Sequence, residues 1–194
     1  EVDISGWLDN YIGGDLYVHA PHPMRMDLAQ RLRAVGGVEA VAPTRYFGVE
    51  RVKADGTNED LSFMAVDPLS YHQVTSFVFA ADQGDPSRLL ERLAGGDAVF
   101  ISSVLSEKYD LRQGDTVRLK TRRGEREFEV AGVVVDFYNR GMVIQGSWRD
   151  MRRYFRLDDV SAFLLTVDPA YSVEEVQSRI DYLYGKRRHV TVDS

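Results

Sequence analysis

Strict alternation of apolar and charged residues in two neighbouring segments constrains the fold of this chain more than any other feature. From Thr116 to Thr121 apolar residues alternate with Arg118 and Lys120, and Arg123-Gly124 then supplies a turn signal. The alternation resumes over residues 125–135. Successive side chains of a strand point to opposite faces, so this pattern predicts a long β-hairpin with one buried and one solvated face.

Shorter periodic segments surround the hairpin, and glycine, proline and capping residues mark their ends. The predicted helices are residues 27–35, a segment with helical spacing at Trp7–Ile12, and those that follow the caps Asp85, Ser102 or Ser103, Ser147 and Ser172. The predicted strands are residues 15–20, 38–54, 61–66, 98–101, 142–145, 162–167 and 189–192. Pro21 and Pro23 are expected to end the first strand.

This order of elements favours an α+β fold, in which two-stranded ribbons are mixed with β-α-β-like units. The first and last parts of the chain share the β-α pattern, so we expect one lobe from residues 1–74 and 138–194. Residues 75–137 then form an inserted mixed α/β lobe that contains the long hairpin. A hinge is expected near residues 75 and 137, where the chain would pass between the lobes.

Bulk properties exclude several classes of protein. The net charge of −6 disfavours a nucleic-acid binder, and the absence of cysteine excludes disulfides and thiolate chemistry. No apolar run approaches the roughly 20 residues of a membrane span, and no signal peptide is recognisable. Because the sequence starts at Glu1 in mid-pattern, we expect it to be a fragment of a longer protein.

The sequence carries no constellation typical of an enzyme. The Walker, dinucleotide-binding and nucleophile-elbow patterns are absent. His19 and His22 offer half a metal site without a third ligand. The acidic pairs Glu59-Asp60, Asp158-Asp159 and Glu174-Glu175 are poor acid/base pairs, since adjacent side chains point in different directions. We therefore predict no catalytic, cofactor-binding or metal-binding residues.

One polar cluster and three basic clusters keep other interpretations open. If the chain were an enzyme with scattered site residues, the first candidates would be Asp136, Tyr138, Asn139 and Arg140, although a linker between lobes explains this cluster better. The basic clusters are residues 118–126, 149–156 and 186–188. We interpret them as solvated faces, with phospholipid headgroups as an alternative contact.

The middle of the chain carries a recognisable motif. A strand at Val99–Ile101 and a short helix lead to Leu111 and Gly114-Asp115, and the ribbon returns through Gly132. In this order, residues 97–136 resemble the periplasmic core domain of MacB-type and FtsX-like ABC-transporter permeases. The physical chemistry of the motif is structural: Gly114-Asp115 suits a tight turn in which Asp115 bonds the backbone two residues on, and Gly132 marks a bulge or close packing.

The resemblance implies a two-lobed α+β module with its β-α-β-like lobe near the membrane. It also implies flanking transmembrane helices, a cytoplasmic ATPase, a second permease copy and an extracytoplasmic protein as partners, at the extracytoplasmic face of the bacterial cell membrane. The expected function is non-catalytic, coupling ATP-driven motion to export or to an extracytoplasmic partner. The alternative is a stand-alone extracytoplasmic domain that binds a peptide or a lipid.

Overall fold

The structure is a computed structural model that describes residues 14–194. The helix predicted at Trp7–Ile12 lies outside these residues. The described chain divides into two compact units, each with its own core. The first unit is Tyr46–Pro68 and Phe77–Leu157, and the second is residues 14–45, Leu69–Ser76 and Asp158–Ser194.

The second unit is built on a four-stranded sheet in the order β2-β8-β1-β9. Its elements are β1 (Leu16–Met24), α2 (Asp27–Arg33), the first part of β2 (Val38–Val52), α3 (Pro68–Val74), β8 (Val160–Val167), α7 (Val173–Ile180) with its continuation η3 (Asp181–Gly185), and β9 (Thr191–Asp193). Strand β8 is antiparallel to β2 and β1, and β9 is antiparallel to β1. The result is two interleaved split β-α-β units, which is the ferredoxin-like topology.

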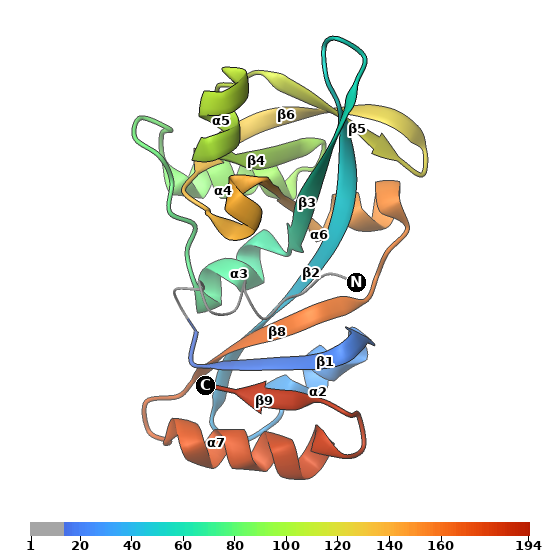
Figure 1. Ribbon diagram of the computed structural model, residues 1–194. Helices are drawn as coiled ribbons and strands as arrows, with labels where there is room; N and C mark the ends of the chain where they lie inside the picture. The colour runs from blue at the N-terminus through green and yellow to red at the C-terminus, as the bar shows by residue number, and fades with distance from the viewer. Residues whose placement is uncertain (1–13) are drawn as a thin grey trace. The chain divides into compact units, whose positions relative to one another are not determined.

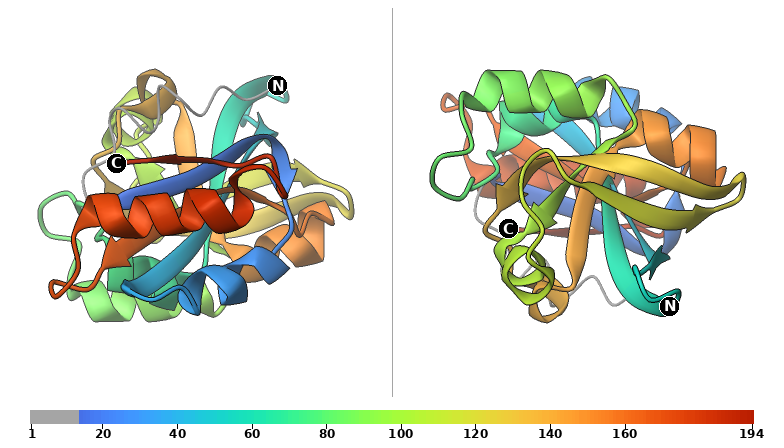
Figure 2. Two further views of the ribbon diagram at one scale, coloured as in Figure 1. Left: turned by 90° about the horizontal axis from the view of Figure 1, so that it is seen from below. Right: turned by 90° about the horizontal axis from the view of Figure 1, so that it is seen from above.

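Helices α2 and α7 of the second unit lie on the same face of its sheet (Figure 1; Figure 2, left). In α2 the buried residues Leu28 and Leu32 are four positions apart, and so are Val176 and Ile180 in α7. This spacing places each pair on one side of its helix, toward the strands.

Strand β1 runs through Pro21 and Pro23, so the prediction that these prolines end the strand is wrong. The pairing with β9 stops at His19, and the register with β8 is irregular between His19 and Met24. Proline cannot donate to a strand ladder, and it is tolerated at irregular or unpaired margins of this kind.

The first unit is a closed six-stranded barrel, a feature that the sequence did not predict. Its elements are the second part of β2, β3 (Asn58–Val66), α4 (Pro86–Ala94), β4 (Ala98–Ser102), α5 (Ser103–Tyr109), β5 (Thr116–Thr121), β6 (Gly124–Val134), η1 (Tyr138–Gly141), β7 (Val143–Ser147), α6 (Trp148–Asp150) and η2 (Met151–Phe155). The strand order is β3-β7-β4-β6-β5-β2, and β3 also pairs with β2, so the pairings form a ring. Closure reduces the length of open sheet edge.

Strands β5 and β6 form the predicted long hairpin (Figure 2, right). The register pairs Thr116 with Glu129 and Thr121 with Gly124, so the loop is Arg122-Arg123 rather than Arg123-Gly124. The alternating apolar side chains Val117, Leu119, Phe128 and Val130 are buried, as the pattern predicts.

Four of the predicted helix caps are present. The side chains of Asp85, Ser102, Ser147 and Ser172 accept hydrogen bonds from backbone N–H groups at the starts of α4, α5, α6 and α7. Helix α3 was not predicted, because seven residues are too short a segment to show a clear helical period. No helix in residues 14–194 is long and apolar enough to cross a membrane.

The two units differ from the predicted lobes in their boundaries. The prediction placed residues 46–68 and 138–157 with the terminal segments, whereas they belong to the unit that contains the hairpin. The reason is strand pairing: β7 lies between β3 and β4, and β2 and β3 close the barrel. The chain crosses between the units near residues 45, 68, 76 and 157, so position 75 lies at a crossing and position 137 lies inside the first unit.

Candidate functional site

The motif that carried the family resemblance forms a tight turn and the start of the hairpin. Gly114 has a φ of 95°, a conformation that favours glycine, and its N–H donates to Val130 O. The carboxylate of Asp115 accepts from the N–H of Arg112 at 2.8 Å, three residues earlier, rather than from a residue two positions later. Leu111 continues the chain from α5, with its N–H donating to Ser106 O.

Gly132 lies at a register shift in the barrel. In the parallel pairing of β4 with β6, Val99 faces Val130 and Phe100 faces Gly132, so Ala131 is the extra residue of a β-bulge. A Cβ atom at Gly132 would lie 3.4 Å from the Phe100 ring. The motif positions therefore shape the barrel wall.

The polar cluster after the hairpin does not converge on a common space. Asp136 accepts from Tyr138 N–H and from the Gln145 amide, and burial raises the pKa of its carboxyl group. The Tyr138 ring packs edge-on against Tyr46, at 4.6 Å between centroids, and Asn139 donates to the hydroxyl of Ser62. This is the corner between β6 and β7, inside the first unit, and not a linker between units.

His19, Asp159 and Glu175 have ionic partners in separate places. His19 Nε2 lies 2.6 Å from Asp193 Oδ2, a contact between β1 and β9. Asp159 pairs with Arg45, and Glu175 pairs with Arg179 within α7. Within residues 14–194, no three His, Asp or Glu residues lie close enough together to hold a metal ion.

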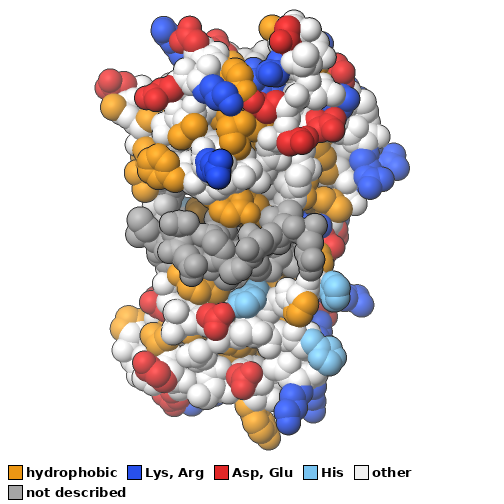
Figure 3. Space-filling view, in the orientation of Figure 1, with side chains coloured by type: hydrophobic (Ala, Val, Ile, Leu, Met, Phe, Trp, Pro, Cys, Tyr) orange, Lys and Arg blue, Asp and Glu red, His pale blue; other side chains and the backbone are white. Residues whose placement is uncertain are grey.

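The basic residues of the hairpin, together with Arg153 of η2, divide into two groups. Arg118 pairs with Glu125 and Glu127, and Lys120 pairs with Glu50 at 3.3 Å. The second group has no ion pair with any described residue and consists of Arg122, Arg123, Arg126 and Arg153. We call these four residues the arginine rim. Figure 3 shows cationic side chains at the right-hand edge of the first unit, where Figure 1 draws the hairpin tip.

Tyr154 contacts three of the four residues of the arginine rim. The guanidinium carbons of Arg126 and Arg153 lie 6.0 and 5.3 Å from the centre of its ring, and its backbone carbonyl accepts from Arg122 N–H at 2.9 Å. The Tyr154 hydroxyl donates to Asp97, and this hydrogen bond raises the pKa of the tyrosine. The ring therefore stays neutral and presents its face to the two guanidinium groups.

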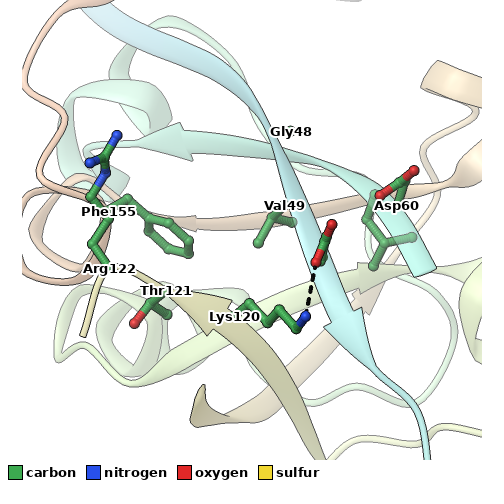
Figure 4. Close-up of a pocket in the computed structure, with 9 residues that line it drawn as sticks. Gly48, Val49, Asp60, Lys120, Thr121, Arg122 and Phe155 are labelled. Atoms are coloured by element: carbon green, nitrogen blue, oxygen red, sulfur yellow. Dashed lines mark ion pairs between the residues drawn. The ribbon is translucent and has the colours of Figure 1, made fainter. Parts of the chain in front are cut away.

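A groove of about 430 Å³ opens beside this rim (Figure 4). It lies where β2 and β5 separate, because these strands pair only at Arg51–Leu119 and Val52–Arg118. Its lining residues are Gly48, Val49, Glu50, Asp60, Leu61, Lys120, Thr121, Arg122 and Phe155. The apolar members are mostly buried and form a floor, while Arg122 and Asp60 lie at its margins.

Sequence analysis did not identify this groove. Its residues come from four segments of the chain, and only the barrel brings them together. One local signal existed: Gly48 interrupts a predicted strand, and a glycine in a strand often marks a bulge or the close approach of another backbone.

Comparison with known proteins decides the family. The sequence profile of the MacB-like periplasmic core domain matches residues 4–183. The chain belongs to the MacB-like periplasmic core domain family. The resemblance inferred from residues 97–136 is thereby confirmed. A comparison with curated proteins gave no match.

Solved structures share the fold of this family member. The extracellular domain of the noncanonic ABC-type transporter YknZ from Gram-positive bacteria has a TM-score of 0.69 at 16% identity, over 94% of this chain and 100% of that chain. The periplasmic region of MacB from Actinobacillus actinomycetemcomitans has a TM-score of 0.66 at 9% identity, over 92% of this chain and 87% of that chain. A domain of a putative permease protein from Porphyromonas gingivalis has a TM-score of 0.59 at 14% identity, over 91% of this chain and 86% of that chain. The α+β fold class is confirmed.

Proposed function

We propose that this domain is the extracytoplasmic part of an ABC-transporter permease and couples ATP-driven motion to export or to an extracytoplasmic partner protein. The observation that carries the proposal is the family match over residues 4–183. Similar folds occur in the extracellular domain of the transporter YknZ and the periplasmic region of MacB. The partners of the domain would be its own transmembrane helices, a cytoplasmic ATPase and a second permease copy.

The internal organisation suits a part that transmits motion without performing chemistry. Each unit has a packed core, and within residues 14–194 the chain passes between the units at four places. Compact bodies joined by a few chain crossings are a common basis for hinge movement. The candidate residues Asp136, Tyr138 and Asn139 have structural hydrogen bonds, which supports a non-catalytic role. In this proposal the second unit, with its β-α-β pattern, lies nearest the membrane.

The sequence of the parent gene on both sides of this segment tests the proposal. Apolar stretches of about 20 residues before and after the domain, with an ATPase gene nearby, are the expected result. Soluble sequence on both sides would contradict it and would favour a stand-alone binding domain.

A further inference from the structure

The groove between β2 and β5 has features of a binding site for an extended polypeptide. Continuing the register of Arg51–Leu119 would pair Glu50 with Lys120 and Val49 with Thr121, but the ladder stops before these pairs. The ion pair between Lys120 and Glu50 spans the opening (Figure 4). The barrel is therefore closed by a two-pair seam, and beyond that seam the edge of β2 faces a cavity instead of a strand. An unpaired strand edge is a template for another strand.

Gly48 fits this role better than a role in the fold. Its φ lies outside the left-handed region, and a Cβ atom built there meets nothing within 4 Å. The fold of the described residues thus gives no reason for glycine at this position, and a glycine inside a strand otherwise costs stability. Space above a strand backbone is what a second backbone needs in order to approach closely.

The floor and rim of the groove define the chemistry of the occupant. Val49, Leu61 and Phe155 provide an apolar floor, each of them buried to more than nine-tenths. Arg122 lies at one margin and Asp60 at the opposite one, so a carboxylate of the occupant belongs at the Arg122 end (Figure 4). Arg126 and Arg153 contact the ring of Tyr154, whose carbonyl accepts from Arg122 N–H. These guanidinium groups have no carboxylate partner among residues 14–194. An occupant with apolar side chains on one face and carboxylates near Arg122 would complement both surfaces.

We propose that this groove binds an extended acidic segment of an extracytoplasmic partner protein, which adds to the edge of β2 and places a carboxylate against the arginine rim. The inference rests on the proposed function, because it supplies the chemistry by which the coupled partner is recognised. A volume of about 430 Å³ suits a few residues of extended chain rather than a folded surface.

A nuclear magnetic resonance titration of the isotope-labelled 194-residue chain tests the proposal. The probe is an acetylated, amidated hexapeptide of alternating valine and glutamate, compared with the same peptide carrying lysine in place of glutamate. Saturable shifts are expected at the amides of residues 48–50 and 120–122, with at least tenfold weaker binding of the lysine peptide. Equal binding of both peptides, shifts elsewhere only, or no saturable shift would overturn the proposal.

Matched variants separate the groove from general charge effects. Gly48→Val should fold, because the space is open, and should abolish the shifts; Arg122→Glu should weaken binding at least tenfold. Arg88→Glu, which makes the same charge change at an exposed position of α4, should leave binding unchanged. If Gly48→Val does not fold, the contrast between Arg122→Glu and Arg88→Glu decides, and equal effects of these two variants would overturn the proposal.

Two further comparisons distinguish a peptide from other ligands and separate a failure of this proposal from a failure of the proposed function. Inorganic phosphate, or vesicles containing phosphatidylglycerol, should not reproduce the peptide shifts. If either does so in both the parent chain and Gly48→Val, the groove is an anion or lipid site and the peptide proposal is overturned. Failure of peptide binding in a chain whose gene encodes flanking membrane spans would remove the groove assignment alone. Loss of the flanking spans with peptide binding intact would remove the permease assignment alone.

Discussion

Gln145 donates a 2.7 Å hydrogen bond from Nε2 to Oδ2 of Asp136, at the corner where β6 leads into β7. Gln145 is completely buried, and its Oε1 has no hydrogen-bond partner among the described residues. Burial raises the pKa of Asp136, while the hydrogen bonds from Tyr138 N–H and from Gln145 act in the opposite direction. A neutral group at position 136 could donate to the unpaired oxygen after the Gln145 amide rotates.

The first prediction concerns the pH dependence of stability. Because the folded pKa of Asp136 is raised, its contribution to stability is fully present below the unfolded pKa of about 4 and is lost as pH rises through the folded pKa. Asp136→Asn cannot ionise, so its free energy of unfolding should rise relative to the parent chain between pH 3.5 and 7. Urea unfolding at both pH values measures this difference.

Asp55→Asn is a control of opposite sign. Hydrogen bonds from the Thr57 side chain and backbone lower the pKa of Asp55, so its contribution is present above the unfolded pKa and is lost as pH falls through the folded pKa. Asp55→Asn should therefore lose stability relative to the parent chain as pH rises. A shift of the same sign in both variants would refute the electrostatic account.

The second prediction compares two glycines of the barrel. A Cβ at Gly146 of β7 would lie 2.2 Å from Phe63 Cζ, and the Phe63 ring is held by Phe47 and Phe155 at centroid distances of 4.8 and 5.4 Å. Gly146→Ala should therefore cost about 1–3 kcal/mol by overpacking. Gly48→Ala should not lower the free energy of unfolding and should raise the melting temperature slightly, because the space around position 48 is open. Equal melting temperatures for the two variants would show that the barrel core yields at Phe63.

The third prediction concerns the ion pair between Arg51 of β2 and Glu59 of β3. The side chains are only 12% and 10% exposed, with Nη1 and Oε1 3.7 Å apart, and Arg51 also lies 4.6 Å from the centre of the Tyr109 ring. Removing one partner leaves the other charge buried, so Glu59→Ala should destabilise the domain by about 3 kcal/mol.

The double variant Arg51→Met with Glu59→Leu serves as the comparison. It removes both charges and keeps apolar volume, so its free energy of unfolding should stay within about 1 kcal/mol of the parent chain. Chemical denaturation of the three proteins gives the comparison. A double variant that is less stable than Glu59→Ala would mean that the pair itself stabilises the fold.

Local rules were sufficient for much of this fold. The hairpin is visible because one solvated face imposes a period of two on residues 116–135, and Asp85 and Ser172 are visible as caps because free N–H groups at helix starts select such side chains. Barrel closure gives no comparable local pattern in the sequence. It depends on the parallel pairings of β3 with β7 and of β4 with β6, which join distant segments.

The groove was beyond sequence analysis for the same reason. It exists because the seam between β2 and β5 is two residue pairs long, and no periodicity records the length of a non-local ladder. The basic pattern of residues 118–126 predicts a solvated face, but it does not separate Arg118 and Lys120, which have ion pairs, from Arg122 and Arg126, which have none with a described residue.

The proposed coupling predicts that ATP changes the relation between the two units. The chain contains no cysteine, so Glu107→Cys on α5 of the first unit and Glu174→Cys on α7 of the second unit would be the only labelling sites in this domain. Both residues are exposed. The measurement is the spin-label distance distribution in the full-length permease, reconstituted with its ATPase in nanodiscs, without nucleotide and with ATP and vanadate. The account predicts that the distribution shifts when nucleotide is trapped, and an unchanged distribution in a preparation that hydrolyses ATP would contradict it.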